Sequence, residues 1–315
     1  MSLPIIIVNP QSAGGATRDA WPKIASDLGR HFGAFKPEFT TSPGEATHLA
    51  AEAARKGTKL IIACGGDGTI SEVANGVLSS GTNAELGILP SGTGGDFRRT
   101  LKIPTRTSEA ARILRTGKTR LLDVGSVVFT NRSGGHETRY FLGVASFGMS
   151  ADVIGRVKEA GESRPIANVS KWLSGRLSFA TAMAETALKS KPTRVAVQLD
   201  EDAERHMTVA NLCIANARYF GGGMKIAPDA KLDDGKFDVV SIGDIGAARI
   251  LANAPRLYIG AHLSIPEVGH ALATKVIARP VNSSEQIEIE VDGELPGYLP
   301  ATFQILGGAL RVRCP

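Results

Sequence analysis

Hydrophobic residues in the first third of the chain follow two spacings in alternation. Short runs of apolar, mostly β-branched residues predict three buried strands, at 4–8, 59–64 and 85–89. Between these runs, apolar residues recur every three to four positions over 21–32 and 46–54, as they do in amphipathic helices. Strands that alternate with helices build a parallel sheet with helices on both faces. We therefore expect an N-terminal α/β domain over residues 1–127.

The hydrophobic pattern changes after about residue 123, to longer strand-like runs separated by Gly, Asn and Asp. Strands are expected at 122–129, 138–144, 194–199, 208–215, 237–242, 275–278 and 287–291. Two helical patterns interrupt them, over 171–189 and 246–263. We therefore expect a second, mostly antiparallel β domain over residues 128–299. A last strand pair, 303–306 and 310–313, fits either domain, so a return of residues 300–315 to the first domain stays open.

The composition of the 315 residues is that of a globular protein. With 43% hydrophobic and 21% charged residues, it excludes a disordered, collagenous or fibrous chain. The first ten residues lack the charged start of a signal peptide, and no uncharged apolar stretch reaches the roughly 18 residues of a membrane helix. We therefore expect a cytoplasmic protein. The three scattered cysteines and six histidines match no disulfide framework or zinc pattern.

Basic residues are concentrated in one stretch of the chain. The formal net charge is +5, yet residues 97–122 carry one acid, Glu109, against Arg98, Arg99, Lys102, Arg106, Arg112, Arg115, Lys118 and Arg120. One interpretation is a solvated helix face. The other is a surface for anionic lipid or polyphosphate, because each Lys or Arg near an anionic membrane adds about 1 kcal/mol. Nucleic acid is not expected, since no aromatic or Arg-rich single-strand platform accompanies the stretch.

The strongest local motif is a strand, a glycine turn and an amphipathic helix in sequence. The turn reads Gly65-Gly66-Asp67-Gly68-Thr69. Its glycines let the backbone pass close to a phosphate, and the helix start offers unpaired N–H groups to it. An acid inside such a loop fits a divalent metal that bridges it to the phosphates. The alternative is an ordinary strand-to-helix turn with Thr69 as N-cap. Neither a P-loop nor a Gly-x-Gly-x-x-Gly dinucleotide motif is present.

Further motifs extend along nearly the whole chain. A second glycine loop, Leu-Pro-Ser-Gly-Thr-Gly-Gly-Asp-Phe, covers 89–97. The others, in chain order, are Val8-Asn9-Pro10-Gln11-Ser12, Thr40 ahead of Pro43-Gly44-Glu45-Ala46, Glu72-Val73-Ala74-Asn75-Gly76, Gly221-Gly222-Gly223-Met224 with Pro228-Asp229-Ala230, Asp233-Asp234-Gly235, and Asp292-Gly293-Glu294. In this order they resemble the catalytic domain of the diacylglycerol kinase and sphingosine kinase superfamily. One departure is Gly95, where that family usually has Asn.

The resemblance implies a nucleotide cleft between two domains, with ATP and Mg²⁺ on the N-terminal one. The residues that it places around the nucleotide are Asn9, Thr40, Gly65, Gly66, Asp67, Gly68, Thr69, Ile70, Ser71, Asn75, Gly92, Thr93 and Gly94. Asp67 would act through Mg²⁺. Glu294 would be the general base for the attacking hydroxyl, assisted by Asp292. From the residues alone, Asp292-Gly293 also fits a hairpin turn with solvated acids.

The same resemblance implies two further sites. Bacterial members of the family hold a structural Mg²⁺ at a loop that matches Asp234 and the backbone of Lys231 and Lys236, although a plain turn is equally compatible. Asp152 matches an acid that recognises the polar end of the sphingoid base in sphingosine kinases. The helical pattern over 171–189 is compatible with a lipid-tail pocket or with ordinary core packing.

The function that the resemblance implies is an ATP-dependent lipid kinase, with a diacylglycerol-like acceptor first. A sphingoid-base or ceramide kinase is the nearest alternative, followed by an NAD kinase and by a non-catalytic lipid-binding regulator. The expected partners are a membrane lipid and the anionic inner surface of the membrane, to which the protein would bind peripherally. No nucleic-acid partner is expected. The sequence leaves the oligomeric state and the identity of the lipid open.

Overall fold

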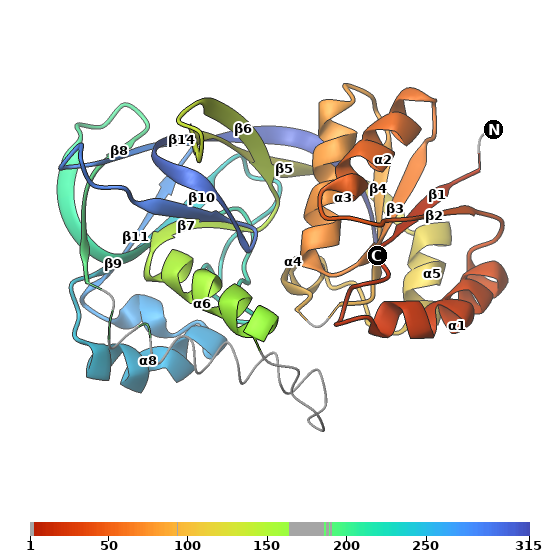
Figure 1. The fold of residues 1–315 in the computed structure, drawn as a ribbon, viewed down its shortest axis with the longest axis horizontal. Coiled ribbons are helices and arrows are strands. Elements are labelled where there is room, and N and C mark those ends of the chain that lie inside the picture. Colours follow the sequence, from red (N-terminus) through yellow and green to blue (C-terminus); the bar gives the residue numbers. More distant parts are fainter. Residues whose placement is uncertain (1–2, 93, 164–185, 187–188, 190) are drawn as a thin grey trace. The chain divides into compact units, whose positions relative to one another are not determined.

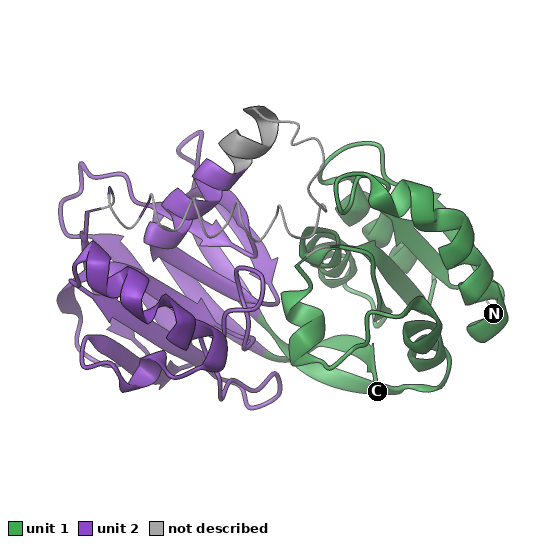
Figure 2. Cartoon of the chain, turned by 90° about the horizontal axis from the view of Figure 1, so that it is seen from below, with its two compact units in different colours: residues 1–124, 307–315 green, residues 125–306 purple. Residues whose placement is uncertain are grey.

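The computed structural model describes residues 3–92, 94–163, 186, 189 and 191–315. The chain folds into two compact units, which Figure 2 shows in different colours. Unit 1 comprises Met1–Val124 and Gly307–Pro315, and unit 2 comprises Gly125–Leu306. The sequence pattern predicted the domain boundary between residues 127 and 128, whereas in the structure the boundary lies between residues 124 and 125.

Unit 1 is an α/β domain. Its elements are β1 (Ile5–Val8), α1 (Ala16–His31), β2 (Lys36–Phe39), α2 (Glu45–Arg55), β3 (Leu60–Gly65), α3 (Asp67–Ser79), β4 (Glu85–Pro90), α4 (Asp96–Thr100), α5 (Thr107–Thr116) and the end of β14 (Glu294–Cys314). The strand order is β14-β4-β3-β1-β2, and the neighbouring pairs are parallel. Helix α2 packs against α3 and α1 against α5, and Figure 1 shows these two pairs on opposite faces of the sheet. Every residue of β3 is buried, as in a central strand covered on both faces.

Unit 2 is built mainly from antiparallel strands, as the sequence predicts. Its elements are the second half of β5 (Lys118–Asn131), whose first half belongs to unit 1, β6 (His136–Phe141), β7 (Val144–Gly148), α6 (Met149–Ser163), β8 (Thr193–Leu199), β9 (Arg205–Ala215), β10 (Phe237–Gly243), α8 (Ala247–Ile259), the 3-10 turn η1 (His262–Ser264), β11 (Val268–Ala273), β12 (Lys275–Pro280), β13 (Glu288–Val291) and the start of β14. The order β11-β10-β9-β7-β13-β14 forms its main path. Every described pairing along this path is antiparallel.

The core of unit 2 contains large aromatic side chains. Phe141 stacks on Phe237 with a ring-centroid distance of 5.6 Å and meets Phe303 edge-on at 6.5 Å. Phe129 and Phe147 are fully buried in the same cluster. Helix α6 packs on β7, β9 and β13. The side chains that these three strands turn toward α6 are therefore shielded from water.

The last strand of the chain is longer than the sequence pattern indicates. The prediction of two strands at 303–306 and 310–313 was wrong, because β14 runs unbroken over 294–314. At the expected turn, Gly308 has a left-handed φ of +59°, and its N–H donates to Oδ1 of Asp123 over 2.8 Å, so a side chain of β5 supports the strand there. The helical pattern over 246–263 ends earlier, since α8 stops at Ile259 and η1 follows. The pattern over 171–189 falls almost entirely outside the described residues.

Candidate active site

Four neighbouring strands of unit 1 end at the same edge of its sheet. Asn9 follows β1, Thr40 follows β2, Gly65 ends β3, and Ser91 follows β4. The strands are in register there, since Val8 pairs with both Phe39 and Cys64, and Gly65 pairs with Pro90. Ligands of open α/β sheets bind at the carboxyl ends of the strands. The structure thus brings together most of the predicted nucleotide-binding residues within one unit.

The first glycine loop is held by side chains from the end of β1. Nδ2 of Asn9 donates to Oγ1 of Thr69 over 3.1 Å, and Oδ1 of Asn9 accepts the N–H of Gln11 over 2.9 Å. Helix α3 begins at Asp67 with Gly66 as its N-cap, and no side chain caps it. The alternative with Thr69 as N-cap was therefore wrong. An uncapped helix start presents backbone N–H groups and a positive dipole end, which is a suitable setting for an anion.

The two glycine loops lie directly against each other. A Cβ on Gly92 would lie only 2.4 Å from the Cα of Gly66, so position 92 has room for glycine alone. The N–H of Ser91 donates to the carbonyl of Gly65 over 2.9 Å, and Oγ1 of Thr17 donates to the carbonyl of Ser91 over 2.8 Å. Gly68 differs, because it is exposed and a Cβ built there meets nothing within 4 Å.

Asp67 holds the second glycine loop in place. Its Oδ2 accepts the N–H groups of Gly95 over 2.6 Å and of Asp96 over 3.0 Å, and its Oδ1 accepts the N–H of Phe97 over 3.2 Å. These contacts use both lone-pair sites of Oδ2, whereas Oδ1 can still bind a further partner. The sequence predicted a metal-linked role for Asp67 but gave no sign of this bonding to residues 95–97.

Gly95 adopts a left-handed backbone conformation, with φ of +72°. Asn tolerates this conformation as well as any non-glycine residue does, so the family's Asn and the Gly of this chain suit the same backbone. The side chain of Arg98 uses the space, because a Cβ on Gly95 would lie 2.5 Å from its Nε. The departure from the family pattern thus leaves the loop conformation intact and places a guanidinium beside it.

The remaining predicted nucleotide-binding residues differ from one another in burial and in their hydrogen-bond partners. Thr40 is buried and donates its N–H to the carbonyl of Val8 over 2.9 Å. The side chains of Ile70 and Ser71 are buried in α3, and Nδ2 of Asn75 donates to the carbonyl of Ser71 over 2.8 Å. Gly94 lies beside Asp67, with a built Cβ 2.7 Å from Oδ2 of Asp67. Thr93 lies outside the described residues.

The predicted catalytic acids of unit 2 lie in a two-residue turn between β13 and β14. Asp292 and Gly293 have φ of +49° and +86°, and Val291 pairs with Glu294. This is the hairpin that the sequence left as the alternative, and two positive φ values are typical of the Asp-Gly turn. The carboxylate of Asp292 accepts the N–H groups of Leu142 and Gly143, each over 2.9 Å. Asp292 is thereby anchored to the connection between β6 and β7, while Glu294 begins β14.

The sequence did not single out Glu290, a buried acid next to this turn. Only 5% of Glu290 is exposed. Burial raises the pKa of its carboxyl to about 7, although hydrogen bonds from Ser146 and Gly293 work against this shift. The alternation of residues 287–291 places its apolar and acidic residues on opposite faces of the strand. Helix α6 covers the β13 region, so the face that carries Glu290 is not solvated.

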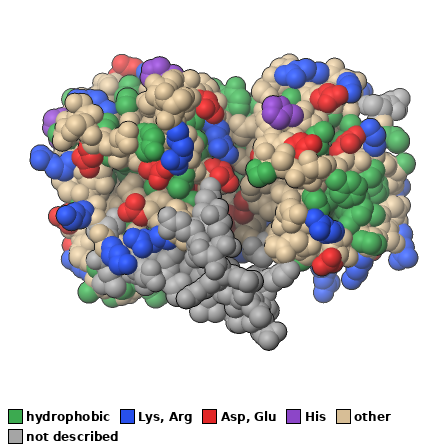
Figure 3. All heavy atoms as spheres, in the orientation of Figure 1, with side chains coloured by type: hydrophobic (Ala, Val, Ile, Leu, Met, Phe, Trp, Pro, Cys, Tyr) green, Lys and Arg blue, Asp and Glu red, His purple; other side chains and the backbone are tan. Residues whose placement is uncertain are grey.

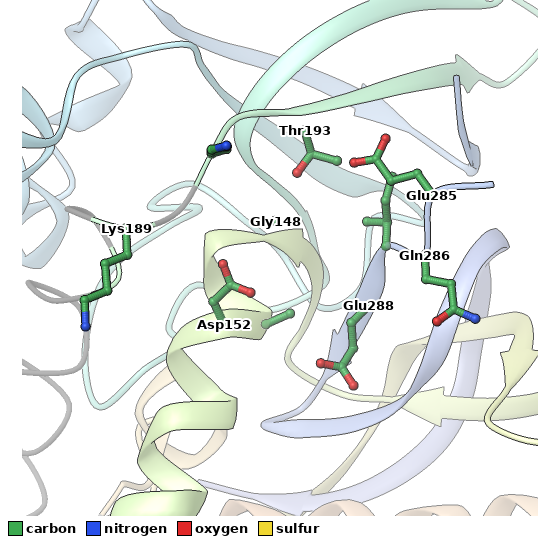
Figure 4. Close-up of a pocket in the computed structure, with 10 residues that line it drawn as sticks. Gly148, Asp152, Lys189, Thr193, Glu285, Gln286 and Glu288 are labelled. Carbon is green, nitrogen blue, oxygen red and sulfur yellow. The ribbon is translucent and has the colours of Figure 1, made fainter. Parts of the chain in front are cut away.

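Asp152 lies exposed in the first turn of α6. The start of α6 is fixed by Asn211, whose Oδ1 accepts the N–H of Ser150 over 2.9 Å. Asp152 borders a pocket of about 240 Å³ (Figure 4). Its lining is mainly polar and includes Gly148, Lys189, Lys191, Glu285 and Glu288.

The predicted metal loop has the geometry of a turn. Oδ1 of Asp234 accepts the N–H of Lys236 over 3.2 Å, and Gly235 has φ of +72°. Within the described part of the chain, no three His, Cys, Asp or Glu side chains come together as a metal-binding group. A metal held by Asp234 with the backbone of Lys231 and Lys236 stays a prediction.

The basic stretch divides into two parts. Arg99 pairs with Asp96 of the second glycine loop, and Arg98 donates to the carbonyl of Ile103, so both side chains are held by contacts within the protein. The side chains further along are exposed: Arg112, Arg115, Lys118 and Arg120. Lys and Arg side chains are also visible in Figure 3 along the lower edge of unit 1, where Figure 1 shows helix α1. No described helix has the length and apolar character to span a membrane.

This chain is similar to known proteins over nearly its whole length. The model of the diacylglycerol kinase catalytic domain matches residues 4–127, and that of the YegS C-terminal NAD kinase beta sandwich-like domain matches 156–314. The diacylglycerol kinase of Bacillus subtilis (strain 168) is 31% identical over 277 residues, which cover 88% of this chain and 84% of that protein. That of Mycobacterium tuberculosis (strain ATCC 25618 / H37Rv) is 31% identical over 98% of this chain and 94% of its own. A diacylglycerol kinase structure from Bacillus anthracis str. Sterne has the same fold, with a TM-score of 0.71 at 22% identity over 99% of this chain and 97% of its own.

Proposed function

This chain belongs to the diacylglycerol kinase family and is a lipid kinase, and we propose that it transfers the γ-phosphate of ATP to a hydroxyl of a diacylglycerol-like membrane lipid. The observation that carries the proposal is the edge of the unit 1 sheet. There, two glycine loops meet beside the uncapped start of α3, and Asp67 lies in the first of them. The names of the relatives favour diacylglycerol among lipids.

The proposed phosphate site is the start of α3. Its first N–H groups have no side-chain cap, and Gly68 leaves open space in front of them. A triphosphate there would be stabilised by the helix dipole and by backbone donors. Asn9 and Thr69 would fix the loop through the hydrogen bond between them.

The residues present fit Mg²⁺ that is bound together with a nucleotide. Mg²⁺ is usually held by one or two carboxylates, phosphate oxygens and water, and so needs no cluster of protein ligands. The Asp67 carboxylate is fixed by three backbone donors and retains acceptor capacity. When bound, Mg²⁺ supplies neutralisation of the phosphate charge.

Glu294 is the proposed general base. In the transfer, the lipid hydroxyl oxygen forms a bond to the γ-phosphorus, and the bond from that phosphorus to the β–γ bridging oxygen breaks. ADP leaves with the electron pair, and the hydroxyl proton passes to the Glu294 carboxylate. Asp292 assists by fixing the turn, through its hydrogen bonds to Leu142 and Gly143.

The polar pocket beside Asp152 is the proposed site for the head of the acceptor lipid. Its mainly polar lining suits a hydrated glycerol or amino-alcohol group better than an acyl chain. The exposed Asp152 carboxylate also favours a second candidate acceptor, a sphingoid base, because it can pair with an ammonium group. We propose that the enzyme acts peripherally at the inner surface of the membrane, where both lipids are reached from the cytoplasm.

The proposed function is tested with [γ-³²P]ATP, Mg²⁺ and one acceptor at a time. The acceptors are diacylglycerol, sphingosine and ceramide in mixed micelles, and NAD in solution. We expect labelled phosphatidic acid as the main product. Labelling of NAD alone would contradict a lipid acceptor, and preferential labelling of sphingosine would transfer the proposal to the sphingoid base.

We expect Asp152→Ala to change lipid selectivity. If the carboxylate binds an ammonium or amide head, its loss should reduce kcat/KM for sphingosine or ceramide by about 10-fold or more, as expected for a charged hydrogen bond, while sparing diacylglycerol. Steady-state rates on each lipid measure this. Glu285→Ala, which removes another acid of the same pocket, is the matched control. An equal loss on every lipid would make Asp152 a structural or general catalytic residue.

The exposed basic side chains of unit 1 are expected to bind anionic membrane. We choose Arg112, Arg115 and Lys118 because they are exposed, whereas Arg106 pairs with Glu109. At about 1 kcal/mol per charge, loss of these three attractions alone should weaken vesicle binding by roughly 100-fold, and the repulsion from the reversed charges should weaken it further. Reversal of all three is measured by co-sedimentation with phosphatidylserine-containing vesicles at low and high salt.

A control variant reverses three other exposed basic residues of unit 1, namely Lys23, Arg55 and Lys59. This variant should bind vesicles as the unmodified protein does, apart from a general effect of net charge. Because exposed charges are screened over about 10 Å at 0.1 M salt, binding should also weaken as salt rises. Vesicle binding that responds neither to the reversal nor to salt would leave the stretch as a solvated face.

A further inference from the structure

A row of buried polar side chains crosses three strands of unit 2 beneath α6. Glu290 on β13 pairs with Ser146 on β7, and Ser146 pairs with Cys213 on β9. In the antiparallel sheet these paired residues project to the same face. They are 5%, 0% and 0% exposed. An ionisable side chain so far from water is costly unless hydrogen bonds compensate it.

Hydrogen bonds connect this row in two directions. Oε1 of Glu290 accepts the N–H of Gly293 over 2.5 Å, and Oε2 of Glu290 accepts the hydroxyl of Ser146. Oγ of Ser146 lies 2.8 Å from Oγ of Ser150, the second residue of α6. The N–H of Ser150 in turn donates to Asn211 over 2.9 Å. The contacts therefore run without a break from the turn after β13 to the first turn of α6.

Both ends of this chain of contacts lie next to residues of the proposed reaction. Gly293 stands between Asp292 and Glu294, and Ser150 is two residues ahead of Asp152. We propose that Glu290 is a positioning residue that, through Ser146 and Ser150, holds the turn bearing Glu294 in a fixed relation to the helix bearing Asp152. This inference rests on the proposed roles of Glu294 and Asp152.

The protonation of Glu290 changes the charge beneath the turn without breaking the contacts. An ionised Glu290 accepts from both Gly293 and Ser146, whereas a protonated one can donate to Ser146, whose hydroxyl can then donate to Ser150. The titratable groups around Glu290 are Cys213 on β9 and Asp292 and Glu294 in the turn. Because the pKa of Glu290 is about 7, this change of charge falls within the range in which kinases are assayed.

The direction of the pH effect follows from the sign of the charge. Above about pH 7, ionised Glu290 places a further negative charge beneath the turn, and this charge favours movement of the positively charged hydroxyl proton toward the turn. The value of kcat should therefore rise through about pH 7. Stability should change in the opposite direction. Because the folded-state pKa lies above the 4.5 of an exposed glutamate, the folded state binds the proton more tightly, and stability declines as pH rises from about 4.5 to 7.

The test compares Glu290→Gln, Glu290→Leu and Ser146→Ala in the full chain. We measure kcat and the KM values for ATP and lipid from pH 5.5 to 8.5, together with the melting temperature. In Glu290→Gln, which can keep both hydrogen bonds, kcat at pH 6 should stay within about 3-fold of the unmodified protein, and its rise through pH 7 should disappear. Glu290→Leu and Ser146→Ala should lower kcat by about 10-fold or more with little change in the KM for ATP.

The control is Asp238→Asn. Asp238 is another buried acid of unit 2, bonded to His270 over 2.7 Å and remote from the turn in the strand order. It should alter the melting temperature but leave the pH profile of kcat unchanged. A Glu290→Gln profile that superimposes on the unmodified one, with full activity in Glu290→Leu, would overturn the inference. Glu294→Gln is measured in parallel to test the assignment of the general base. If Glu294 is not the base, kcat of Glu294→Gln will be unchanged. If kcat of Glu294→Gln falls but the Glu290 variants behave like the unmodified protein, only the role of Glu290 is wrong.

Discussion

Glu294→Gln is expected to lower kcat for lipid phosphorylation by about 10² to 10⁴-fold, the usual contribution of a general base. Gln has the shape of Glu but cannot take up the proton of the attacking hydroxyl. The pairing of position 294 with Val291 uses only backbone groups, so the hairpin should be retained. The KM for ATP should change little, because the proposed nucleotide-binding residues belong to unit 1. Initial rates over a matrix of ATP and lipid concentrations measure both quantities.

Glu204→Gln is the control for this variant. Glu204 belongs to the same unit, lies outside the pocket beside Asp152, and forms an ion pair with Arg279 at 2.5 Å. Its neutralisation should leave kcat within about 3-fold of the original value, since a partly exposed ion pair contributes little. If kcat of Glu294→Gln were unaffected, proton acceptance would have to be assigned elsewhere, first to Asp67.

Asp67→Asn should reduce kcat/KM for Mg·ATP by about 100-fold or more, the scale on which loss of one electrostatic contact to a reacting group is felt. Two physical effects act together. The substitution removes the negative charge proposed to face Mg²⁺. It also replaces an acceptor oxygen with an amide NH₂, so one or more of the N–H groups of Gly95, Asp96 and Phe97 lose their partner.

A Mg²⁺ titration separates these two effects. If Asp67 binds nucleotide through the metal, a higher Mg²⁺ concentration should restore part of the activity, which a loosened loop would not allow. Asp96→Asn is the control, because it neutralises an adjacent acid that pairs with Arg99. Unchanged activity of Asp67→Asn throughout the titration would contradict a metal-linked role.

The sequence predicted β1, β3 and β4 and helices α1, α2 and α3 of unit 1, because each is defined by nearby residues, but it did not predict the short strand β2. A central parallel strand such as β3 is an apolar run, and its flanking helices show their own periodicity. The unbroken course of β14 could not be predicted in this way. Gly307 and Gly308 resemble a turn, and the side chain that supports the strand at this point, Asp123, lies far away in sequence.

The candidate site was predicted unevenly for the same reason. Glycine loops and acidic turns are local motifs, so the sequence located Asp67 and the Asp292-Gly293 turn. It could not show that Asp67 accepts the N–H groups of residues 95–97. Nor could it predict that Glu290 is buried. The alternation along β13 separates two faces of the strand but does not indicate which element covers each face. Only the packing of α6 makes the acidic face an interior one.

Gly92 and Gly68 differ in whether the fold itself excludes a side chain, and this difference affects how the two loops can evolve. At Gly92 the protein itself forbids a side chain, because the backbone of Gly66 occupies the space. Every missense change at that codon adds a Cβ and must push the loops apart, whatever the protein binds. At Gly68 the protein sets no such limit, since nothing lies within 4 Å of a built Cβ. A lineage that gave up nucleotide binding would therefore be free to lose Gly68 long before Gly92.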